Sequence, residues 1–572
     1  MFRIFRAKRH LARGRSWLEQ GQVEKALFSL QKAHVLAPQL PLVVYWLGHA
    51  LYKASRYGEA HPLFASLVGE QESHAESAYW AGMSLYNQQL YGEAARAFQI
   101  AIRQNGVDPF NHYRLGLSWY YLKQYDKAQQ SFARAVVLDS TNPSMHRWLG
   151  CTLYKRKRYE EAEQSLETAL ALEPNYEANH YWLGKVFLKL ERFADAVAAL
   201  QRSAALAPED GSNHFWLGKA LYENQQYCAA EESWRQALFL RSEDEANHYW
   251  LGMSLQAQGR YEEALSSFQS ALERAPRDAS NRFWCGNMAY KLKRYKAAEQ
   301  EFQEALRLEP QSASYMRWVG ICLFFQKRYG EAEALFNRAV VLAPHHNDGY
   351  YWLGRNRYEQ SQYERAEEPL RRAIALKPDD ESNQFWLGMV LYRLQRYDEA
   401  ENPFLRSLEL ESNDPANHYW LGMNYHRLRM YTQAEPFLQK AIDMRPNKGN
   451  YHYWLGMNAY HQDLLQDAEA SFFRAVKLMP DEEPHHFWLG MCRYKRNHFD
   501  KAVVSFGQAL ELGPQDEVNH YWMGKCLHEL ARFDEAIACL KQAVKLNPND
   551  AANHNALRRS IQAKLAHNES EL

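Results

Sequence analysis

The sequence predicts an all-α chain, a solenoid in which sixteen helix-turn-helix repeats stack one after another. Three observations predict it: glycine recurs every 34 residues, alanine follows each of these glycines twelve residues later, and proline ends most repeats. A fixed period of roughly 20 to 50 residues is typical of repeat architectures. One hairpin cannot bury its apolar face alone, so stacking the repeats creates a continuous core.

The glycines set the register of the repeat, and each repeat is numbered so that this glycine is position 8. They are Gly14, Gly48, Gly82, Gly116, Gly150, Gly184, Gly218, Gly252, Gly286, Gly320, Gly354, Gly388, Gly422, Gly456, Gly490 and Gly524. The alanine at position 20 runs from Ala26 to Ala536 without a gap, and proline stands at position 32 in eleven repeats. Two antiparallel helices can approach closely where glycine and alanine lack bulk, and the proline stops the second helix.

Positions 4, 7, 8 and 11 share one face of a helix, as spacings of three and four require. We therefore expect repeats over residues 7–550, starting at residues 7, 41, 75, 109, 143, 177, 211, 245, 279, 313, 347, 381, 415, 449, 483 and 517. Residues 1–6 are expected to form a basic and apolar N-terminal extension, and residues 551–572 a polar capping helix and a tail. In this last segment, Ala556 replaces the usual tryptophan.

The composition of the chain argues against several classes of protein. The 572 residues carry a formal net charge of zero, which argues against a nucleic-acid-binding protein because phosphate contacts require a basic surplus. The seven cysteines are scattered without a CxxC pair, so we expect buried reduced thiols, no metal site and a cytoplasmic location. No uncharged apolar run is long enough to span a bilayer.

The first sixteen residues carry six basic and no acidic groups beside Phe2, Ile4 and Phe5. Such a segment could touch an anionic surface, so a peripheral contact of residues 1–16 with the inner membrane is kept as an alternative. A solvated first helix is the simpler interpretation, because a single weak signal anchors a protein poorly.

The repeat pattern resembles that of the tetratricopeptide-repeat family. In residues 177–210 the shared features are Leu183 and Gly184 at positions 7 and 8, Phe193 at 17, Ala196 at 20, Leu200 at 24 and Pro208 at 32. The resemblance covers residues 7–550. It implies an α-α superhelix whose first helices line a concave surface, and a function in protein–protein interaction without a cofactor.

Two positions depart from this family. Tryptophan is usual at position 4, but here position 4 is histidine in eleven units: His10, His112, His146, His180, His214, His248, His418, His452, His486, His520 and His554. These histidines are expected to form hydrogen bonds or fill core space. Tryptophan instead occupies position 6, from Trp46 to Trp522, with Arg114 as an exception. Positions 4 and 6 lie about 200° apart around a helix, and the resemblance places position 6 at or near the inner groove.

Packing between neighbouring first helices is the other interpretation of these tryptophans, and a mixed role is compatible with both. Repeats twelve to fifteen have the most apolar inner face, and we predict that they form the partner-binding groove. We call this set the strip: Phe385, Trp386, Met389, Tyr419, Trp420, Met423, Tyr453, Trp454, Met457, Phe487, Trp488 and Met491. Its position-5 rings, at 385, 419, 453 and 487, are expected to lie outside the shared core face.

The sequence therefore predicts a non-catalytic scaffold or adaptor that binds protein partners, such as an extended segment, in an aromatic groove. The alternative is an accessory protein of bacterial polysaccharide assembly, suggested by a short likeness of residues 111–116 to repeats found with capsule-polymer transferases. An enzyme is disfavoured because phosphate-loop, zinc-protease and serine-hydrolase motifs are absent. A clamp for a chaperone's C-terminal carboxylate is not expected either, because aromatic residues replace its lysine and asparagine positions.

Overall fold

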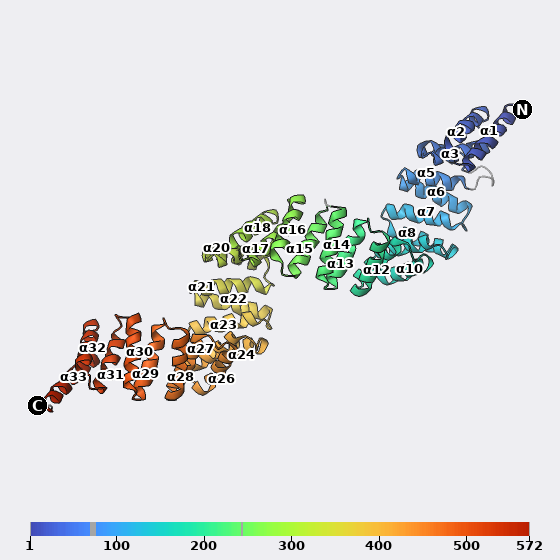
Figure 1. Ribbon diagram of the computed structural model, residues 1–572. Helices are drawn as coiled ribbons and strands as arrows, with labels where there is room; N and C mark the ends of the chain where they lie inside the picture. The colour runs from blue at the N-terminus through green and yellow to red at the C-terminus, as the bar shows by residue number, and fades with distance from the viewer. Residues whose placement is uncertain (1, 69–75, 242–243, 571–572) are drawn as a thin grey trace. The chain divides into compact units, whose positions relative to one another are not determined.

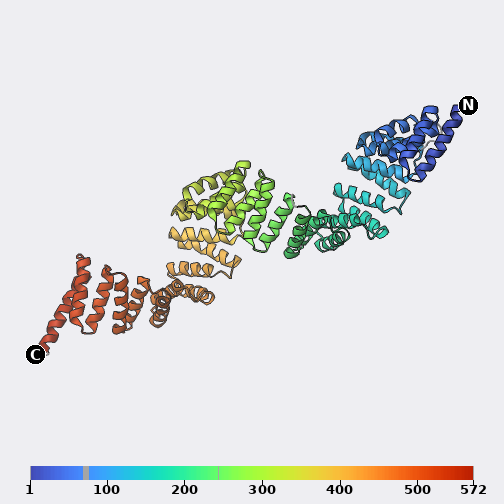
Figure 2. The same ribbon diagram turned by 45° about the horizontal axis from the view of Figure 1, so that its top comes forward.

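The computed structural model describes residues 2–68, 76–241 and 244–570, and the regular secondary structure of these stretches is entirely helical (Figure 1). The chain divides into two units, residues 1–292 and 293–572, and each is a stack of antiparallel helix pairs (Figure 2). This confirms the all-α solenoid. Met1, the expected repeat start at residue 75 and the last two residues of the expected tail lie outside the described residues.

The first unit holds seventeen of the described helices: α1 Phe2–Glu19, α2 Val23–Leu36, α3 Pro41–Lys53, α4 Tyr57–Ser66, α5 Ser77–Asn87, α6 Tyr91–Gln104, α7 Pro109–Tyr121, α8 Tyr125–Leu138, α9 Pro143–Lys155, α10 Tyr159–Leu172, α11 Glu177–Lys189, α12 Phe193–Leu206, α13 Gly211–Glu223, α14 Tyr227–Leu240, α15 Glu245–Ala257, α16 Tyr261–Arg274 and α17 Ala279–Lys291. From α7 onward the odd-numbered helices begin 34 residues apart, so each pair of helices corresponds to one sequence repeat.

The second unit holds the remaining described helices: α18 Tyr295–Leu308, α19 Ala313–Phe325, α20 Tyr329–Leu342, α21 Asn347–Glu359, α22 Tyr363–Leu376, α23 Glu381–Arg393, α24 Tyr397–Leu410, α25 Pro415–Arg427, α26 Tyr431–Met444, α27 Gly449–His461, α28 Leu465–Leu478, α29 Glu483–Lys495, α30 Phe499–Leu512, α31 Glu517–Glu529, α32 Phe533–Leu546 and α33 Ala551–Ser570. Helix α1 begins at Phe2, inside the expected extension, and α33 continues to Ser570, within the segment expected to form a capping helix and a tail.

Local chemistry explains where the helices begin and end. Aspartate often precedes the first helix of a repeat, and Asp414 Oδ1 accepts a hydrogen bond from the Ala416 N–H at 2.8 Å, which caps α25. The first helix ends in a left-handed turn at position 15, as at Lys327, where φ is 62°. There the Arg328 N–H donates to the Leu323 carbonyl at 2.9 Å, and this pattern satisfies the last carbonyls of the helix.

The position-8 glycine lies where the two helices of a hairpin touch. A Cβ atom built on Gly490 would lie 2.8 Å from Cε1 of Phe506, which is the position-24 residue of the same repeat and is fully buried. Gly388 meets Phe404 in the same way at 2.7 Å. Ala502, at position 20, has no exposed surface. The prediction that glycine and alanine allow a close approach is confirmed.

Replacing Gly490 with alanine should therefore destabilise the second unit, because the added methyl group overlaps the Phe506 ring. Overpacking costs about 1–3 kcal/mol, whereas alanine gains roughly 1 kcal/mol in helix propensity, so the net change should be a loss of up to about 2 kcal/mol. We expect a lower urea midpoint. Gly507, in the partner helix α30, is the matched control, since a Cβ there meets nothing within 4 Å; Gly507→Ala should raise the midpoint. Equal shifts in the two variants would contradict the close-contact explanation.

Candidate functional site

The position-6 tryptophans form joints between consecutive repeats. Trp488 in α29 packs edge-to-face on Tyr460, with ring centroids 5.1 Å apart, and lies parallel to Phe472 at 6.5 Å. Both partners belong to the preceding repeat, at positions 12 and 24. In the first unit, Trp148 contacts Tyr120 at 5.0 Å and Phe132 at 6.3 Å in the same arrangement. The tryptophans are half-buried. The tryptophans therefore pack between neighbouring repeats, and a role of their accessible part in a groove stays a prediction.

The structure corrects the expected contribution of the methionines to the strip. Met389, Met423, Met457 and Met491 are only 5–8% exposed and belong to the hydrophobic core clusters. They sit at position 9, where they fill space among the aromatic rings. The accessible part of the strip therefore consists of its position-5 and position-6 rings, which are half-buried, and the four methionines support these rings from beneath. Whether the strip binds a partner stays a prediction.

The position-5 rings also differ from the expectation, because they take part in packing. Tyr419 stacks on Tyr451 of the next repeat with ring centroids 4.6 Å apart, and it contacts Trp420 at 5.4 Å. Tyr453 lies 4.9 Å from the ring of His485 and 5.8 Å from Phe472. Burial raises the pKa of both tyrosines. The prediction that position 5 lies outside the core face is wrong, since each ring joins two repeats.

Exposed cations border the strip at position 13. Arg393 Nε donates a hydrogen bond to the Tyr358 hydroxyl at 3.0 Å, and Arg427 Nε donates to the Tyr392 hydroxyl at 3.1 Å. Lys495 Nζ lies 4.1 Å from the ring centroid of Tyr460. We call Arg393, Arg427 and Lys495 the rim cations. They are exposed and hold their charge beside the half-buried rings, which the sequence analysis did not anticipate.

A second set of cations, also missed from sequence, lies at position 9 between consecutive tryptophans. Lys185 Nζ is 4.5 Å from the ring centroid of Trp182 and 4.3 Å from that of Trp216, and burial lowers the pKa of this lysine to about 8. Arg355 lies over Trp352 and Trp386 at 5.4 and 4.6 Å. The signal in the sequence was the lysine or arginine at position 9 of five repeats: Arg15, Lys185, Lys219, Arg355 and Lys525.

Most position-4 histidines form the hydrogen bonds expected of them, and these bonds join consecutive repeats. Nε2 of His180 lies 2.9 Å from the carbonyl oxygen of Pro174, and Nε2 of His452 lies at the same distance from the Pro446 carbonyl. The preceding residue adds a further bond, since Asn179 Nδ2 donates to the Glu173 carbonyl at 3.1 Å. Both residues thus bind the loop at position 31–32 of the repeat before.

The seven thiols differ in their burial. None of the cysteines forms a disulfide bond, and five of them are buried as expected, but Cys228 is exposed and Cys539 is half-buried. Burial raises the pKa of Cys322 and Cys492 to about 12, which keeps these thiols protonated. Among the described residues no cluster of histidine, cysteine and carboxylate side chains could hold a metal ion. No helix within the described stretches is long and apolar enough to cross a membrane.

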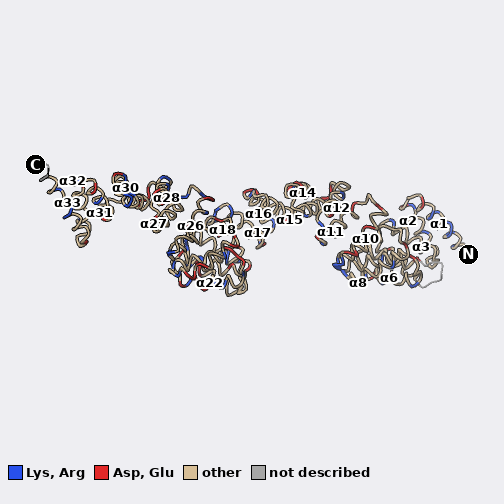
Figure 3. Tube along the Cα trace, turned by 90° about the horizontal axis from the view of Figure 1, so that it is seen from below, with Lys and Arg blue, Asp and Glu red and all other residues tan. Residues whose placement is uncertain are grey.

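Helix α1 presents the basic and apolar segment that the sequence singled out. Phe2 and Phe5 are each 72% exposed, and Arg6 lies over the Phe2 ring at 4.9 Å. Elsewhere the two signs of charge alternate along the chain (Figure 3). A membrane contact through residues 1–16 stays a prediction.

Several sequence families match the chain. Families described as tetratricopeptide repeats match residues 113–177, 215–279, 249–313 and 286–347, residues 153–213 and 493–561, and residues 416–448. The family described as anaphase-promoting complex, cyclosome, subunit 3 matches residues 19–101 and 325–407. No curated protein sequence matches the chain.

Solved structures with a similar fold include the crystal structure of the APC/C hetero-tetramer Cut9–Hcn1, which is 17% identical with a TM-score of 0.37. The match covers 84% of this chain and 95% of that one. YrrB, described as a TPR protein with an unusual peptide-binding site, is 21% identical over 32% of this chain and 94% of its own, with a TM-score of 0.30. MamA residues 41 to the end, from Desulfovibrio magneticus RS-1, is 21% identical over 29% of this chain and 95% of its own, with a TM-score of 0.29.

Trp420→Ala tests whether position 6 is chiefly structural. Trp420 packs on Tyr392 and Tyr419 with ring centroids 5.4 Å away in each case, so its removal should lower the unfolding free energy by about 3 kcal/mol. Chemical denaturation followed by circular dichroism measures the change. Phe473→Ala, in α28, is the control because that ring is largely exposed and should shift stability by less than about 0.5 kcal/mol. An unchanged midpoint for Trp420→Ala would contradict the joint.

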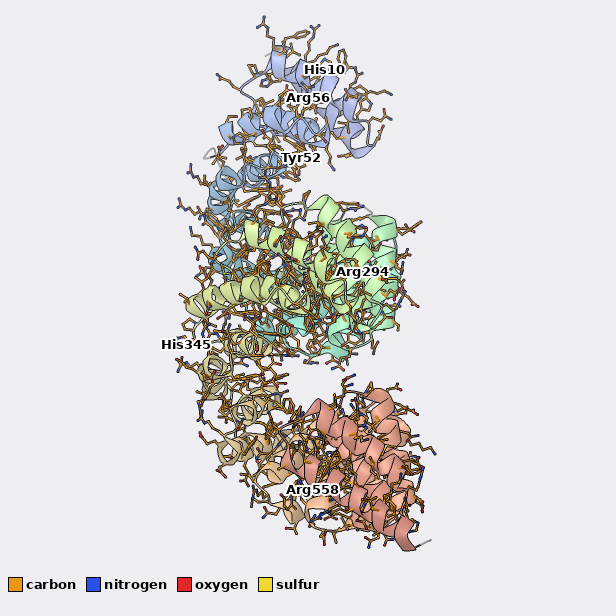
Figure 4. All side chains as sticks on the ribbon, turned by 90° about the vertical axis from the view of Figure 1, so that its left-hand side faces the viewer. His10, Tyr52, Arg56, Arg294, His345 and Arg558 are labelled. Carbon is orange, nitrogen blue, oxygen red and sulfur yellow. The ribbon has the colours of Figure 1, made fainter. Side chains whose placement is uncertain are left out.

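His426 should make the second unit sensitive to acid. Burial lowers its pKa to about 4, whereas the unfolded value is about 6.5. The unfolded chain therefore takes up the proton first, and stability is lost as the pH falls from about 6.5 toward 4. His426→Tyr installs the common position-12 residue and should reduce this loss by up to about 3 kcal/mol, measured by urea unfolding at pH 7 and pH 4.5. His345→Tyr is the control, because His345 is exposed (Figure 4). If wild type and His426→Tyr lose stability equally between pH 7 and pH 4.5, His426 is not the source of the acid sensitivity.

Proposed function

Because the chain belongs to the tetratricopeptide-repeat family, we propose that it is a non-catalytic scaffold that binds an extended protein segment along the strip. The observation that carries this proposal is the regular recurrence of half-buried rings, with an exposed cation at position 13 of three of the four repeats. Phe385, Tyr419, Tyr453 and Phe487 recur once per repeat, on α23, α25, α27 and α29. An extended chain that follows these helices would meet the same chemistry at each step.

The energetics of recognition favour such a surface. Aromatic side chains dominate binding hot spots because they offer large rigid contact areas at a small entropic cost. Packing already fixes the strip rings, as the stacking of Tyr419 on Tyr451 illustrates, so little further ordering is required when a partner binds. The rim cations of this surface contact tyrosine hydroxyls and rings. A binding role uses all of these features.

The rim cations indicate the chemistry of the partner. Arg427 lies 5.3 Å from the ring centroid of Trp454 and also donates to Tyr392, so its charge stays next to the strip. A partner segment in which apolar residues alternate with aspartate or glutamate would place rings or aliphatic groups on the strip and carboxylates on the rim. We place this binding in the cytoplasm, which suits the free thiols. No observation favours the polysaccharide alternative over a protein partner.

Reversing the rim cations should weaken partner binding at least tenfold without unfolding the chain. The variant Arg393→Glu, Arg427→Glu and Lys495→Glu changes exposed residues, so its melting temperature should stay within a few degrees of wild type. Affinity capture from an extract of the source cell, followed by mass spectrometry and affinity measurement with the captured protein, should show at least a tenfold loss.

The matched control reverses three exposed cations on second helices of the same region, Arg372→Glu, Lys440→Glu and Lys477→Glu. It changes the net charge equally and should retain the partner. If the rim variant captures the same proteins with the same affinity as wild type, the strip is not the binding surface. Retention of a purified polysaccharide in place of protein would favour the alternative function.

A further inference from the structure

The last joint of the second unit lacks its tryptophan and contains a cavity instead. Helix α33 carries Ala556 at position 6, and a cavity of about 210 Å³ opens between α33 and the pair α31 and α32. Its lining includes Tyr521, Lys525, His528, Leu540 and Arg559. We call this cavity the vacant joint.

Another joint of the same unit shows which side chain occupies the corresponding space when tryptophan is present. There His426 at position 12 and Leu438 at position 24 are followed by Trp454 at position 6, whose ring lies 5.3 Å from the His426 ring in an edge-to-face contact. The vacant joint has the same two residue types at these positions, His528 and Leu540. It differs at position 6, where the indole is missing.

The histidine orientation is also preserved between the two joints. Nδ1 of His426 lies 3.4 Å from Asn458 Oδ1, and Nδ1 of His528 lies 3.0 Å from Ser560 Oγ. In both joints the partner of the histidine lies at position 10, on the first helix of the following repeat. The histidine ring is therefore held in place by the same kind of contact, and the vacant joint retains the wall against which Trp454 packs in its counterpart.

The cation of the vacant joint lies over one tryptophan where its counterparts lie over two. Lys185 and Arg355 each lie over the tryptophan of their own repeat and that of the next, at distances between 4.3 and 5.4 Å. Lys525 lies 4.3 Å from the ring centroid of its own Trp522, but the next repeat offers Ala556. Lys525 also lies over the rings of Tyr494 and Tyr521, at 5.1 and 5.5 Å. An indole placed in the cavity would add the contact with a second tryptophan that Lys185 and Arg355 have.

We propose that the vacant joint binds an aromatic side chain, tryptophan above all, of a protein partner in which acidic residues flank that side chain. A cavity of about 150 Å³ already accepts a benzene ring, so the volume suffices for an aromatic ring, and the lining of this cavity is more polar than apolar. The flanking charge follows from Lys525 and Arg559 in the lining, against the single carboxylate of Glu529, and from Arg558 on the same helix (Figure 4). The exposed Phe2 and Phe5 of a second copy fit less well, because Arg3 and Arg6 beside them would be repelled.

Arg114 is the contrasting case. It also replaces tryptophan at position 6, but its side chain is long and its Nε is buried, so that joint is filled from within the chain. Ala556 is too short to do the same. This site lies on α31–α33, apart from the strip on α23–α29, and its occupation does not depend on the function proposed for the strip.

The experiment uses the full chain and the blocked tripeptide acetyl-Asp-Trp-Asp-amide as probe, with saturation-transfer NMR and titration as readouts. Wild type should bind the probe through its indole, whereas acetyl-Asp-Ala-Asp-amide should not bind and acetyl-Lys-Trp-Lys-amide should bind at least fivefold more weakly. Ala556→Trp should fill the joint from within, raise the melting temperature and remove probe binding. Ala551→Trp adds an indole at an exposed position of the same helix and should leave binding unchanged.

A second variant tests the cation. Lys525→Met installs the residue that position 9 carries in six other repeats, so it should fold normally and weaken the probe at least fivefold. The proposal is overturned if Ala556→Trp binds the probe like wild type. It is likewise overturned if Ala556→Trp melts at a lower temperature than wild type. It is also overturned if wild type self-associates and Ala556→Trp abolishes that association, because a second copy would then be the occupant.

Discussion

The close contact between the position-8 glycine and the bulky residue at position 24 is the constraint on which each repeat depends. Phe506 and Leu540 fill the space that a side chain at Gly490 or Gly524 would occupy, with ideal Cβ positions less than 3 Å from ring or branch atoms. This contact sets the distance between the two helices of a hairpin. Once that distance is fixed, the position-24 residue presents one face to the next repeat, and the tryptophan of that repeat packs on it.

The joints between repeats combine an apolar wedge with a polar latch. The position-6 tryptophan fills the space between two hairpins, while the Asn-His pair at positions 3 and 4 binds carbonyl groups of the preceding loop, as Asn417 and His418 do at 3.2 and 3.0 Å. The wedge supplies buried apolar area, and the latch satisfies backbone groups that a tightly packed loop would otherwise leave without partners. Together they make each repeat dependent on its neighbour.

This construction decides which residues remain for binding. The strip rings are half-buried because they pack within and between repeats, as Tyr419 does on Tyr451, and the methionines lie in the core clusters. The surface that a partner can reach is therefore a row of ring edges and faces with cations at its border. A joint becomes a site when its own wedge is missing, which in the described part of the chain sets the vacant joint at α33 apart from the tryptophan joints.

The sequence by itself determined the period, the two helices of each repeat, the glycine–alanine contact and the candidate rings, because these depend on spacing and on bulk along one chain. It did not determine the depth of Met389 and Met423, the stacking of Tyr419 on Tyr451, or the pairing of Arg427 with Tyr392. These depend on how far one repeat is rotated against the next, which no single repeat encodes. The cavity beside Ala556 likewise required the structure, since a small residue in the sequence shows a missing side chain but not whether its neighbours close the gap.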